Sequence, residues 1–384
     1  MKHPRILLGV LAVALLLGIA ALSNQDDSSP AIVQASGRSM TGNEIGNPNG
    51  PNQHTESTVG GHGSPVKVGP RTTLPLYDGE YGLDREINPR MTLNAAVVPA
   101  KVDEQVDPLL AIQAEAEGLL IPDDFDTPII NQNGQGFTGV NPPDTIGDVG
   151  PDHYLQMINS AGGAVFTVYN KADGTVAAGP ITLDTLAPSG SCASGLGDPV
   201  VLYDVVSGRW LLSEFSGSGN FICMYVSDSD DPVTATWDFY GFQFASFPDY
   251  FKIGIWPDSL FVSLNTGGNI DAAAMDWQAM LAGQPASFVT ASNAPPQSAF
   301  GFQTFTAADR DGFIDVPAGE PGIFMRHYDD EAHNPGSANP ATDFLQIWEF
   351  DVDWSNPGAA TFTQAPNIEI TEFSSEMCGF TAFA

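Results

Sequence analysis

A strand pattern that recurs about every fifty residues is the feature that most limits what this chain can fold into. The copies begin at His153 (HYLQMIN), Arg209 (RWLLSEF), Ser259 (SLFVSLN) and Gly322 (GIFMRHY). A turn rich in Asp, Gly and Pro precedes each copy, and further short strands such as FICMYVS lie between copies. A repeat of this length with about four strands is typical of a β-propeller blade.

The predicted fold is therefore all-β and β-propeller-like, with about four blades in residues 136–384. From Gly136 onward, aromatic and β-branched residues occur in short runs separated by Gly, Pro, Asp and Asn, a pattern that favours strands and turns. One stretch in this part of the chain, DAAAMDWQAMLAG (residues 271–283), predicts a helix because it is rich in helix formers and ends in Gly.

In combination, four motifs resemble a family of secreted bacterial β-propeller-like proteins with sialidase- or glycosidase-like blades. The motifs are PPDTIGDVGPDHYLQMIN, GDPVVLYDVVSGRWLLSEF, FKIGIWPDSLFVSLN and FLQIWEFDVDW, and the resemblance covers residues 141–380. It implies a fold and a compartment more than an activity. Similar proteins continue past the position of Cys378, so we expect this chain to be C-terminally truncated and its ring of blades to be incomplete.

The N-terminal third predicts export followed by a linker. Residues 1–23 combine Lys2 and Arg5 with an uncharged apolar run and small residues at the cleavage spacing, which indicates a signal peptide. An uncleaved N-terminal membrane anchor is the alternative. Residues 24–135 predict a low-complexity linker, because residues 23–69 are rich in Gly, Asn, Ser and Pro, and one short helix is expected at 107–120 in the more mixed second half. The expected location is therefore extracellular or periplasmic.

The formal net charge of −33, from 46 acidic and 13 basic residues, limits the partners. It argues against nucleic acid, whose phosphates need a basic surface, and against anionic membrane surfaces. Contact with a membrane is expected only through an uncleaved N-terminal segment. A carbohydrate or a protein ligand remains open, and the acidity is explained either by solubility or by divalent cation binding.

Three cysteines stand in the sequence, an odd number for an oxidising compartment. Cys192 and Cys223 lie in the same repeat on either side of RWLLSEF, so we expect them to form a disulfide. Cys378 would then need a partner beyond the present end. The alternative is that all three are buried free thiols.

Asp144, Asp198 and Asp249 each occupy the corner that opens a repeat. The simpler interpretation is structural, because Asp caps its own backbone in such turns. The functional alternative follows from GDPVVLYD, which resembles the first inner strand of propeller glycosidases, where such an Asp acts as base or nucleophile. Asp144, Asp198 and Asp249 could then converge on a central channel and serve as paired carboxylates. A glutamate that would act as proton donor is not identifiable.

A calcium site is the second candidate. In ADRDGFID, Asp309, Asp311 and Asp315 surround a Gly turn, and alternate carboxylates suit a hard cation. The sequence lacks the glutamate of an EF-hand loop, and a solvated turn is the alternative.

Three further features favour structural roles. SDSDDPVTATW (residues 227–237) resembles the structural Asp-box turn of sialidase-type propellers, and HYDDEAH is not a zinc motif, so surface positions are expected for His327 and His333. Tryptophans recur at equivalent strand positions and predict packing between blades, with sugar stacking as the alternative; they are Trp210, Trp237, Trp256 and Trp348.

Taken together, the sequence predicts a secreted or cell-surface propeller that binds a ligand. The alternative is a glycan-active hydrolase that uses paired central carboxylates.

Overall fold

The computed structural model describes residues 130–266, 272–291, 294, 305–310, 316–333 and 342–373, with the backbone of short strands at 54–56, 58–63, 67–68, 83–84, 376–377 and 380–381. Two units are distinguished, Met1–Glu44 and Ile45–Ala384, and every described residue belongs to the second. The expected signal peptide, the helix at 107–120 and Cys378 lie outside the described residues.

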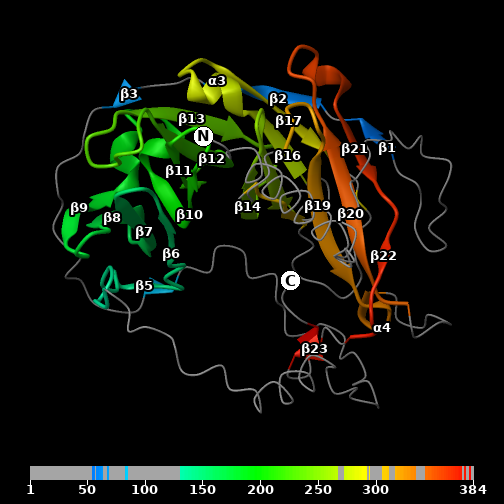
Figure 1. The fold of residues 1–384 in the computed structure, drawn as a ribbon, viewed down its shortest axis with the longest axis horizontal. Helices are drawn as coiled ribbons and strands as arrows, with labels where there is room; N and C mark the ends of the chain where they lie inside the picture. Colours follow the sequence, from blue (N-terminus) through cyan, green and yellow to red (C-terminus); the bar gives the residue numbers. More distant parts are fainter. Residues whose placement is uncertain are drawn as a thin grey trace, which may run out of the picture. The chain divides into compact units, whose positions relative to one another are not determined.

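Four antiparallel sheets follow one another along the chain, as Figure 1 shows, and the all-β prediction is confirmed. Each sheet is built from consecutive strands and resembles a propeller blade. The first contains β6 (Ile146–Val149), β7 (His153–Ser160), β8 (Gly163–Asn170) and β9 (Val176–Thr182). The second contains β10 (Gly195–Asp204), β11 (Arg209–Ser216), β12 (Phe221–Ser227) and β13 (Trp237–Gln243). The third contains β14 (Asp249–Ile255), β15 (Ser259–Asn265), β16 (Ala272–Asp276) and β17 (Ala286–Ala291). The fourth contains β18 (Thr306–Ala307), β19 (Gly322–Tyr328), β20 (Phe344–Asp351), β21 (Thr361–Gln364) and β22 (Ile368–Glu369).

Three hydrophobic clusters hold neighbouring sheets face to face. Leu155 and Phe166 of the first sheet pack with Trp210 of the second. Other clusters join the second sheet to the third and the third to the fourth. Both faces of a middle sheet are therefore buried, which explains why inner strands such as β12 and β15 are buried at nearly every position rather than at every second one.

The four repeated tryptophans belong to these interfaces. Trp210, Trp237 and Trp348 are at most 1% exposed, and Trp256 is 6% exposed. Burying one such side chain contributes roughly 2–3 kcal/mol. The prediction of packing between blades is confirmed, and these four rings offer no free face for a sugar.

Short strands from the expected linker extend three of the sheets. β1 (His54–Glu56) pairs with β21, β2 (Thr58–Gly63) pairs with β17, and β3 (Lys67–Val68) pairs with β13. Each adds to the outer edge of a sheet and satisfies backbone groups that an edge strand leaves open. Two further pairs are small: β4 (Leu83–Asp84) with β5 (Val140–Asn141), and β23 (Glu376–Met377) with β24 (Phe380–Thr381).

The helical prediction at residues 271–283 is wrong in its first half. Residues 272–276 form β16, and only α3 (Trp277–Leu281) is helical. The alanines of β16 are buried between β15 and β17, so tertiary pairing overrides their helix propensity. Asp276 then caps α3 by accepting a hydrogen bond from the Ala279 N–H. The other short helical segments are α4 (Asp330–His333), η1 (Leu183–Leu186), η2 (Ser191–Ala193) and η3 (Pro357–Ala359).

Candidate functional site

The three repeated aspartates meet at one end of the sheets. Asp144 precedes β6, Asp198 lies near the start of β10, and Asp249 is the first residue of β14. The charges of Asp144 and Asp249 both act on the carboxyl group of Asp198, so the three groups form one cluster. Asp144 is exposed, Asp198 is partly buried, and Asp249 is buried, which leaves the cluster open on one side.

The backbone at this cluster departs from regular strand geometry. Asp144, Asp198 and Tyr250 have positive φ angles of 41°, 52° and 52°. Non-glycine residues rarely adopt this left-handed conformation, and such strained positions gather at functional sites. The strand pairing is also irregular within the first residues of β10 and β14. The irregular backbone is compatible with both interpretations of these aspartates, the structural and the functional, and both stay predictions.

Asn159, at the inner end of β7, links two of the aspartates. Its Nδ2 donates to Oδ2 of Asp144 over 2.5 Å, to Oδ1 of Asp198 over 3.3 Å and to the carbonyl of Pro142 over 3.1 Å. Its Oδ1 accepts the backbone N–H of Asp198 over 2.7 Å. Sequence reasoning missed this residue. The signal was present, because HYLQMIN and SLFVSLN both end in Asn, and the second of these, Asn265, pairs opposite Asp249.

The pKa of the Asp198 carboxyl group is raised to near neutrality. Burial, the charge of Asp144 and a hydrogen bond shared with the Asp144 carboxyl raise the pKa of Asp198 to about 7. Asn159 opposes this shift because its N–H stabilises the ionised form, and Asp249 adds to it. A carboxyl group that titrates near 7 can act both as a donor and as an acceptor.

Lys252 supplies positive charge beside the carboxylates. Its Nζ lies 3.8 Å from the centre of the Tyr250 ring. Burial of the ammonium lowers the pKa of Lys252, while the charges of Asp198, Asp144 and Asp249 oppose that shift. Much of the Lys252 residue is nevertheless exposed, so it is accessible from solvent. Sequence reasoning missed it, although few basic residues follow position 136.

The geometry of the cluster bears on its chemistry. Asp144 and Asp198 are in hydrogen-bonding contact. In glycosidases the two catalytic carboxyl groups stand about 5–9 Å apart so that a sugar or a water fits between them. Asp144 and Asp198 together resemble a proton-sharing pair more than a glycosidase pair.

The calcium candidate is only partly described. Oδ1 of Asp309 accepts the N–H of Ile255 over 2.8 Å and that of Arg310 over 2.9 Å, so this carboxylate joins the third sheet to the segment after β18. Asp311 and Asp315 lie outside the described residues. Calcium binding by these three aspartates therefore stays a prediction.

Cys192 and Cys223 form a disulfide with a Cα–Cα distance of 5.7 Å, between η2 and β12. A disulfide is typical of an oxidising compartment outside the cytosol. Within the described part of the chain, no helix is long and apolar enough to cross a membrane.

The Asp-box-like turn between β12 and β13 is structural. Asp228 accepts the N–H of Thr236 over 2.9 Å and also its hydroxyl, and Asp231 accepts the N–H of Val233 over 2.9 Å. These bonds close the turn on itself, as expected for this motif.

The expectation of surface histidines in HYDDEAH is wrong for His333, which is 5% exposed. The short helix α4 folds back so that His333 lies 5.5 Å from His327 and 5.4 Å from Tyr328 between ring centres. Burial, followed by the charge of His327, lowers the pKa of His333 to about 4. His333 is therefore neutral at physiological pH.

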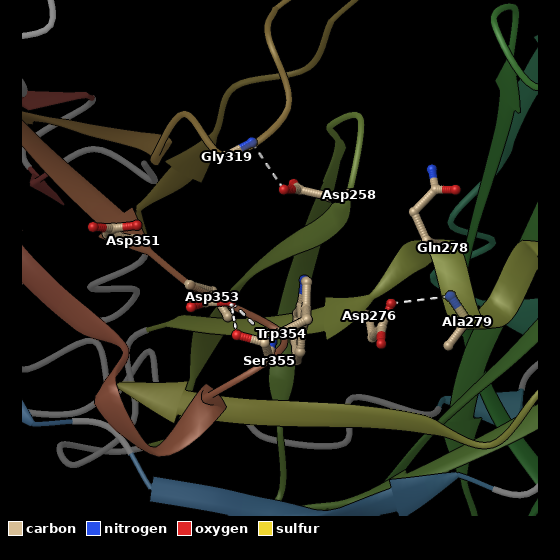
Figure 2. Close-up of a pocket in the computed structure, with 10 residues that line it drawn as sticks. Asp258, Asp276, Gln278, Ala279, Gly319, Asp351, Asp353, Trp354 and Ser355 are labelled. Atoms are coloured by element: carbon tan, nitrogen blue, oxygen red, sulfur yellow. Dashed lines mark hydrogen bonds between the residues drawn. The ribbon is translucent and has the colours of Figure 1, made fainter.

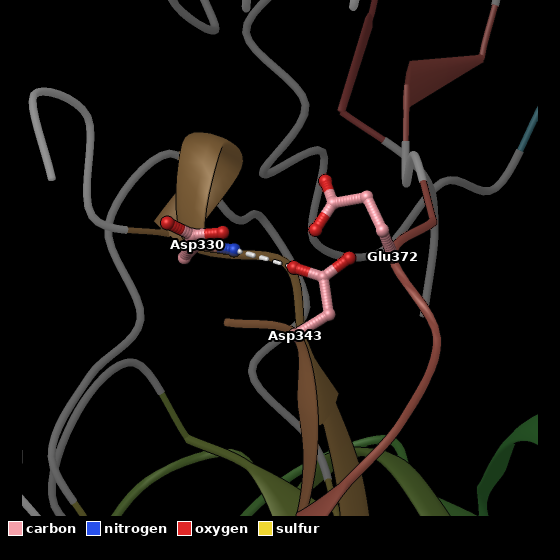
Figure 3. Close-up of side chains that lie close together, drawn as sticks. All are labelled: Asp330, Asp343 and Glu372. Carbon is pink, nitrogen blue, oxygen red and sulfur yellow. Dashed lines mark hydrogen bonds between the residues drawn. The ribbon is translucent and has the colours of Figure 1, made fainter. Parts of the chain in front are cut away.

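A carboxylate triad beside α4 could hold a metal ion (Figure 3). One oxygen each from Asp330, Asp343 and Glu372 lies within 4.8 Å of the others. Asp330 and Asp343 are only 3% and 1% exposed. The two oxygens of Asp343 accept the N–H groups of Asp330 and Phe373 over 3.1 and 2.6 Å. Sequence reasoning missed this group because its members come from three separate segments.

A pocket of about 510 Å³ lies between the third and fourth sheets (Figure 2). It is near the C-terminal end of β14, whereas Asp249 is at the N-terminal end of that strand. Its lining includes Asp258, Asp276, Asp351, Asp353 and Trp354. Burial, opposed by the Ala279 N–H and reinforced by the charge of Asp258, raises the pKa of Asp276. The pocket is acidic, and it is separate from the aspartate cluster.

Comparison with known proteins gives distant structural similarities to glycoside hydrolases. No family model and no curated protein matches the sequence. Among solved structures, a candidate exo-beta-1,3-galactanase from Bifidobacterium bifidum is 11% identical, with 63% of this chain and 94% of that chain covered and a TM-score of 0.30. A GH43 glycoside hydrolase engineered for endo-xylanase and exo-arabinofuranosidase activity is also 11% identical, with 63% and 44% covered and a TM-score of 0.27. At these values neither similarity bears on activity.

Proposed function

We propose that this protein is an exported, propeller-like binding protein that takes a carbohydrate at the cluster of Asp144, Asp198 and Asp249. The observation that supports the proposal best is the meeting of these side chains with Lys252 at the open end of three sheets. Asp144 and Lys252 are exposed, so a ligand can reach them from solvent.

The donors and acceptors of the cluster suit a polyhydroxylated ligand. Each sugar hydroxyl both donates and accepts a hydrogen bond. The oxygens of Asp144 accept, the Lys252 ammonium donates, and Asp198 can do either because its pKa is about 7. Asn159 holds Asp144 and Asp198 in place before a ligand arrives, which reduces the entropy lost on binding.

Export is supported by two independent features. The N-terminal sequence has the organisation of a signal peptide. The Cys192–Cys223 disulfide suits an oxidising compartment.

Binding to a panel of soluble and insoluble polysaccharides tests this proposal, by depletion assay and calorimetry on the mature protein. We expect Asp198→Ala to weaken binding at least about tenfold, since it removes a donor and an acceptor. The control is Asp173→Ala. The side chain of Asp173 lies in an exposed hairpin turn and accepts hydrogen bonds from Thr175. Equal affinities for Asp198→Ala and the wild type, or binding to no polysaccharide, would reject the proposal.

Hydrolysis is the second candidate, favoured by the pKa of about 7 for Asp198. That value suits a group that donates a proton and then recovers it near neutral pH. The close contact of Asp144 with Asp198 counts against a direct glycosidase pair. Release of reducing ends from the bound polysaccharide, with a pH profile that turns near 7 and is lost in Asp198→Asn, would favour hydrolysis over binding alone.

For the carboxylate triad we propose calcium as the bound cation. Calcium takes oxygen ligands, and Asp330, Asp343 and Glu372 supply three carboxylates at close range. Burying like charges together is costly unless a cation or a proton compensates. Addition of calcium to chelator-treated protein should raise the melting temperature, and Asp343→Asn should remove that rise. An identical melting temperature with calcium and with chelator would reject the site.

A further inference from the structure

A second pair of carboxyl groups, one of them fully buried, contacts the backbone just before Asp198. Glu214 of β11 is 0% exposed, and Asp184 belongs to η1. A Cβ atom at Gly163 would lie 2.6 Å from Oε2 of Glu214 and 3.0 Å from Oδ1 of Asp184, and one at Gly195 would collide with both oxygens. The two carboxyl groups are therefore neighbours, and glycine is required at both positions to make room for them.

The pair holds the backbone on either side of the site. Oε2 of Glu214 accepts the N–H of Ala164 over 2.8 Å, and Oδ1 of Asp184 accepts the N–H of Gly195 over 2.6 Å. Glu214 also receives a hydrogen bond from the backbone of Gly197, the residue before Asp198. Ala164 in turn pairs opposite Asn159 in the β7–β8 ladder. The pair thus contacts both Ala164, which lies opposite Asn159, and Gly197, which precedes Asp198.

Two carboxyl groups in contact, one of them fully buried, are stable when they share a proton. Burial and then the charge of Asp184 raise the pKa of Glu214 well above its usual value. Tyr225 of β12 faces the same pair, and its pKa is raised by burial and by the charges of Glu214 and Asp184. A proton between the two groups lets one donate to the other while Oε2 of Glu214 and Oδ1 of Asp184 still accept the backbone N–H groups of Ala164 and Gly195.

The backbone that the pair contacts is the part of β10 that strand pairing fixes least. Pairing with β11 shifts register between Gly195 and Gly197 and again between Gly197 and Val200. Gly197 and Asp198 have positive φ angles of 101° and 52°. We infer that Asp184 and Glu214 share one proton and act as a positioning pair that holds Asp198 in its strained conformation. The inference rests on the proposed function only in treating Asp198 as the ligand-contacting residue.

The test is the titration of the Asp198 carboxyl group, followed by carbon-13 NMR on aspartate-labelled protein and assigned by comparison with Asp198→Asn. Glu214→Gln keeps an acceptor for Ala164 and a donor for Asp184, so we expect Asp198 to titrate near the wild-type pH. Glu214→Leu removes both, and we expect the midpoint of Asp198 to move by about one unit or more toward the usual aspartate range. The control is Glu369→Gln, which changes an exposed glutamate in β22.

Asp184→Asn keeps an acceptor for the Gly195 N–H but removes the negative charge of a pair that shares one proton, and it decides the matter if Glu214→Leu does not fold. It should fold, and it should leave the Asp198 midpoint closer to the wild-type value than to the usual aspartate range. An unchanged Asp198 midpoint in folded Glu214→Leu would overturn the positioning role. If Asp198 titrates in Asp184→Asn at the pH expected for an unfolded chain, the proton-sharing account is overturned.

This experiment needs no carbohydrate, so its failure is distinct from failure of the proposed function. If Glu214→Leu lowers the titration midpoint of Asp198 but the wild type binds no polysaccharide, only the binding proposal is rejected. If polysaccharide binding requires Asp198 but the Asp198 midpoint is the same in the wild type and in Glu214→Leu, only the positioning pair is rejected.

Discussion

Asn159 and Asp198 hold each other by two reciprocal hydrogen bonds. The backbone N–H of Asp198 donates to Oδ1 of Asn159 over 2.7 Å, and Nδ2 of Asn159 donates to Oδ1 of Asp198 over 3.3 Å. Asn159 is 2% exposed and comes from the first sheet, whereas Asp198 belongs to the second. The conformation of the site is thus tied to the packing of two sheets.

Replacing Asn159 should raise the pKa of Asp198 further. The Nδ2–H of Asn159 stabilises ionised Asp198, so Asn159→Ala removes the contact that lowers this pKa. We expect the Asp198 titration to move above 7 and the free energy of unfolding to fall by about 1–3 kcal/mol. Carbon-13 NMR and urea unfolding measure the two effects. Asn170→Ala is the control, because its side-chain bond to Thr175 is exposed; a downward shift in Asn159→Ala would contradict this account.

Asp198 should make the protein less stable as the pH rises. Its folded pKa of about 7 lies above the ordinary 3.8, so its contribution to stability is complete below about pH 4 and is lost as the pH rises through 7. Asp198→Asn cannot ionise, and we expect its stability to exceed that of the wild type at pH 8–9 by on the order of 2 kcal/mol, allowing for partial exposure. Urea unfolding at pH 5, 7 and 9 compares the two proteins. Parallel pH profiles for the variant and the wild type would argue against the raised pKa.

Asp204 and Arg310 form a buried ion pair, so replacing either residue alone should destabilise the protein strongly. Nη2 of Arg310 lies 2.9 Å from Oδ1 of Asp204, and their side chains are 6% and 2% exposed. Arg310→Met leaves the Asp204 carboxylate buried without its cation, at a cost of about 3–5 kcal/mol. The double variant Asp204→Asn with Arg310→Met should recover most of that loss. Additive losses in the double-mutant cycle would show that the pair is not coupled.

The same pair predicts sensitivity to acid. Burial alone would raise the pKa of Asp204, but Ser207, Arg310 and Trp277 outweigh it and hold the pKa below 3.8. The stability that ionised Asp204 contributes is present above this ordinary value and is lost as the pH falls through the lower folded value. Arg310→Met should therefore unfold at a higher pH than the wild type in an acid titration followed by tryptophan fluorescence. Coincident acid transitions would refute the prediction.

Removing the disulfide should destabilise the chain without changing the site. Cys192 and Cys223 are 31 residues apart, and a loop of this size gives about 3–4 kcal/mol of stabilisation in the chain-entropy account. We expect this loss for the double variant with both residues changed to alanine, measured by denaturant unfolding under oxidising conditions. Cys378→Ser serves as the control. An equal loss in Cys378→Ser would mean that Cys378 contributes to stability as well.

The sequence predicted the repeat well because blades are local structures. A strand that pairs with its neighbour along the chain leaves an alternation of apolar runs and turns that can be read directly. The half-wrong helix at residues 271–283 shows the limit, since the propensity of its alanines lost to pairing with β15 and β17.

The sequence by itself also brought out Asp144, Asp198 and Asp249, because each one opens a repeat. Only the tertiary structure decided that they meet, that Asn159 and Lys252 join them, and that Asp184 and Glu214 contact the backbone just before Asp198. The reason is physical: repeat position depends on neighbours along the chain, whereas burial, proximity of charge and the resulting pKa depend on residues brought together from different sheets. The carboxylate triad of Asp330, Asp343 and Glu372 follows the same rule, since no short motif contains it.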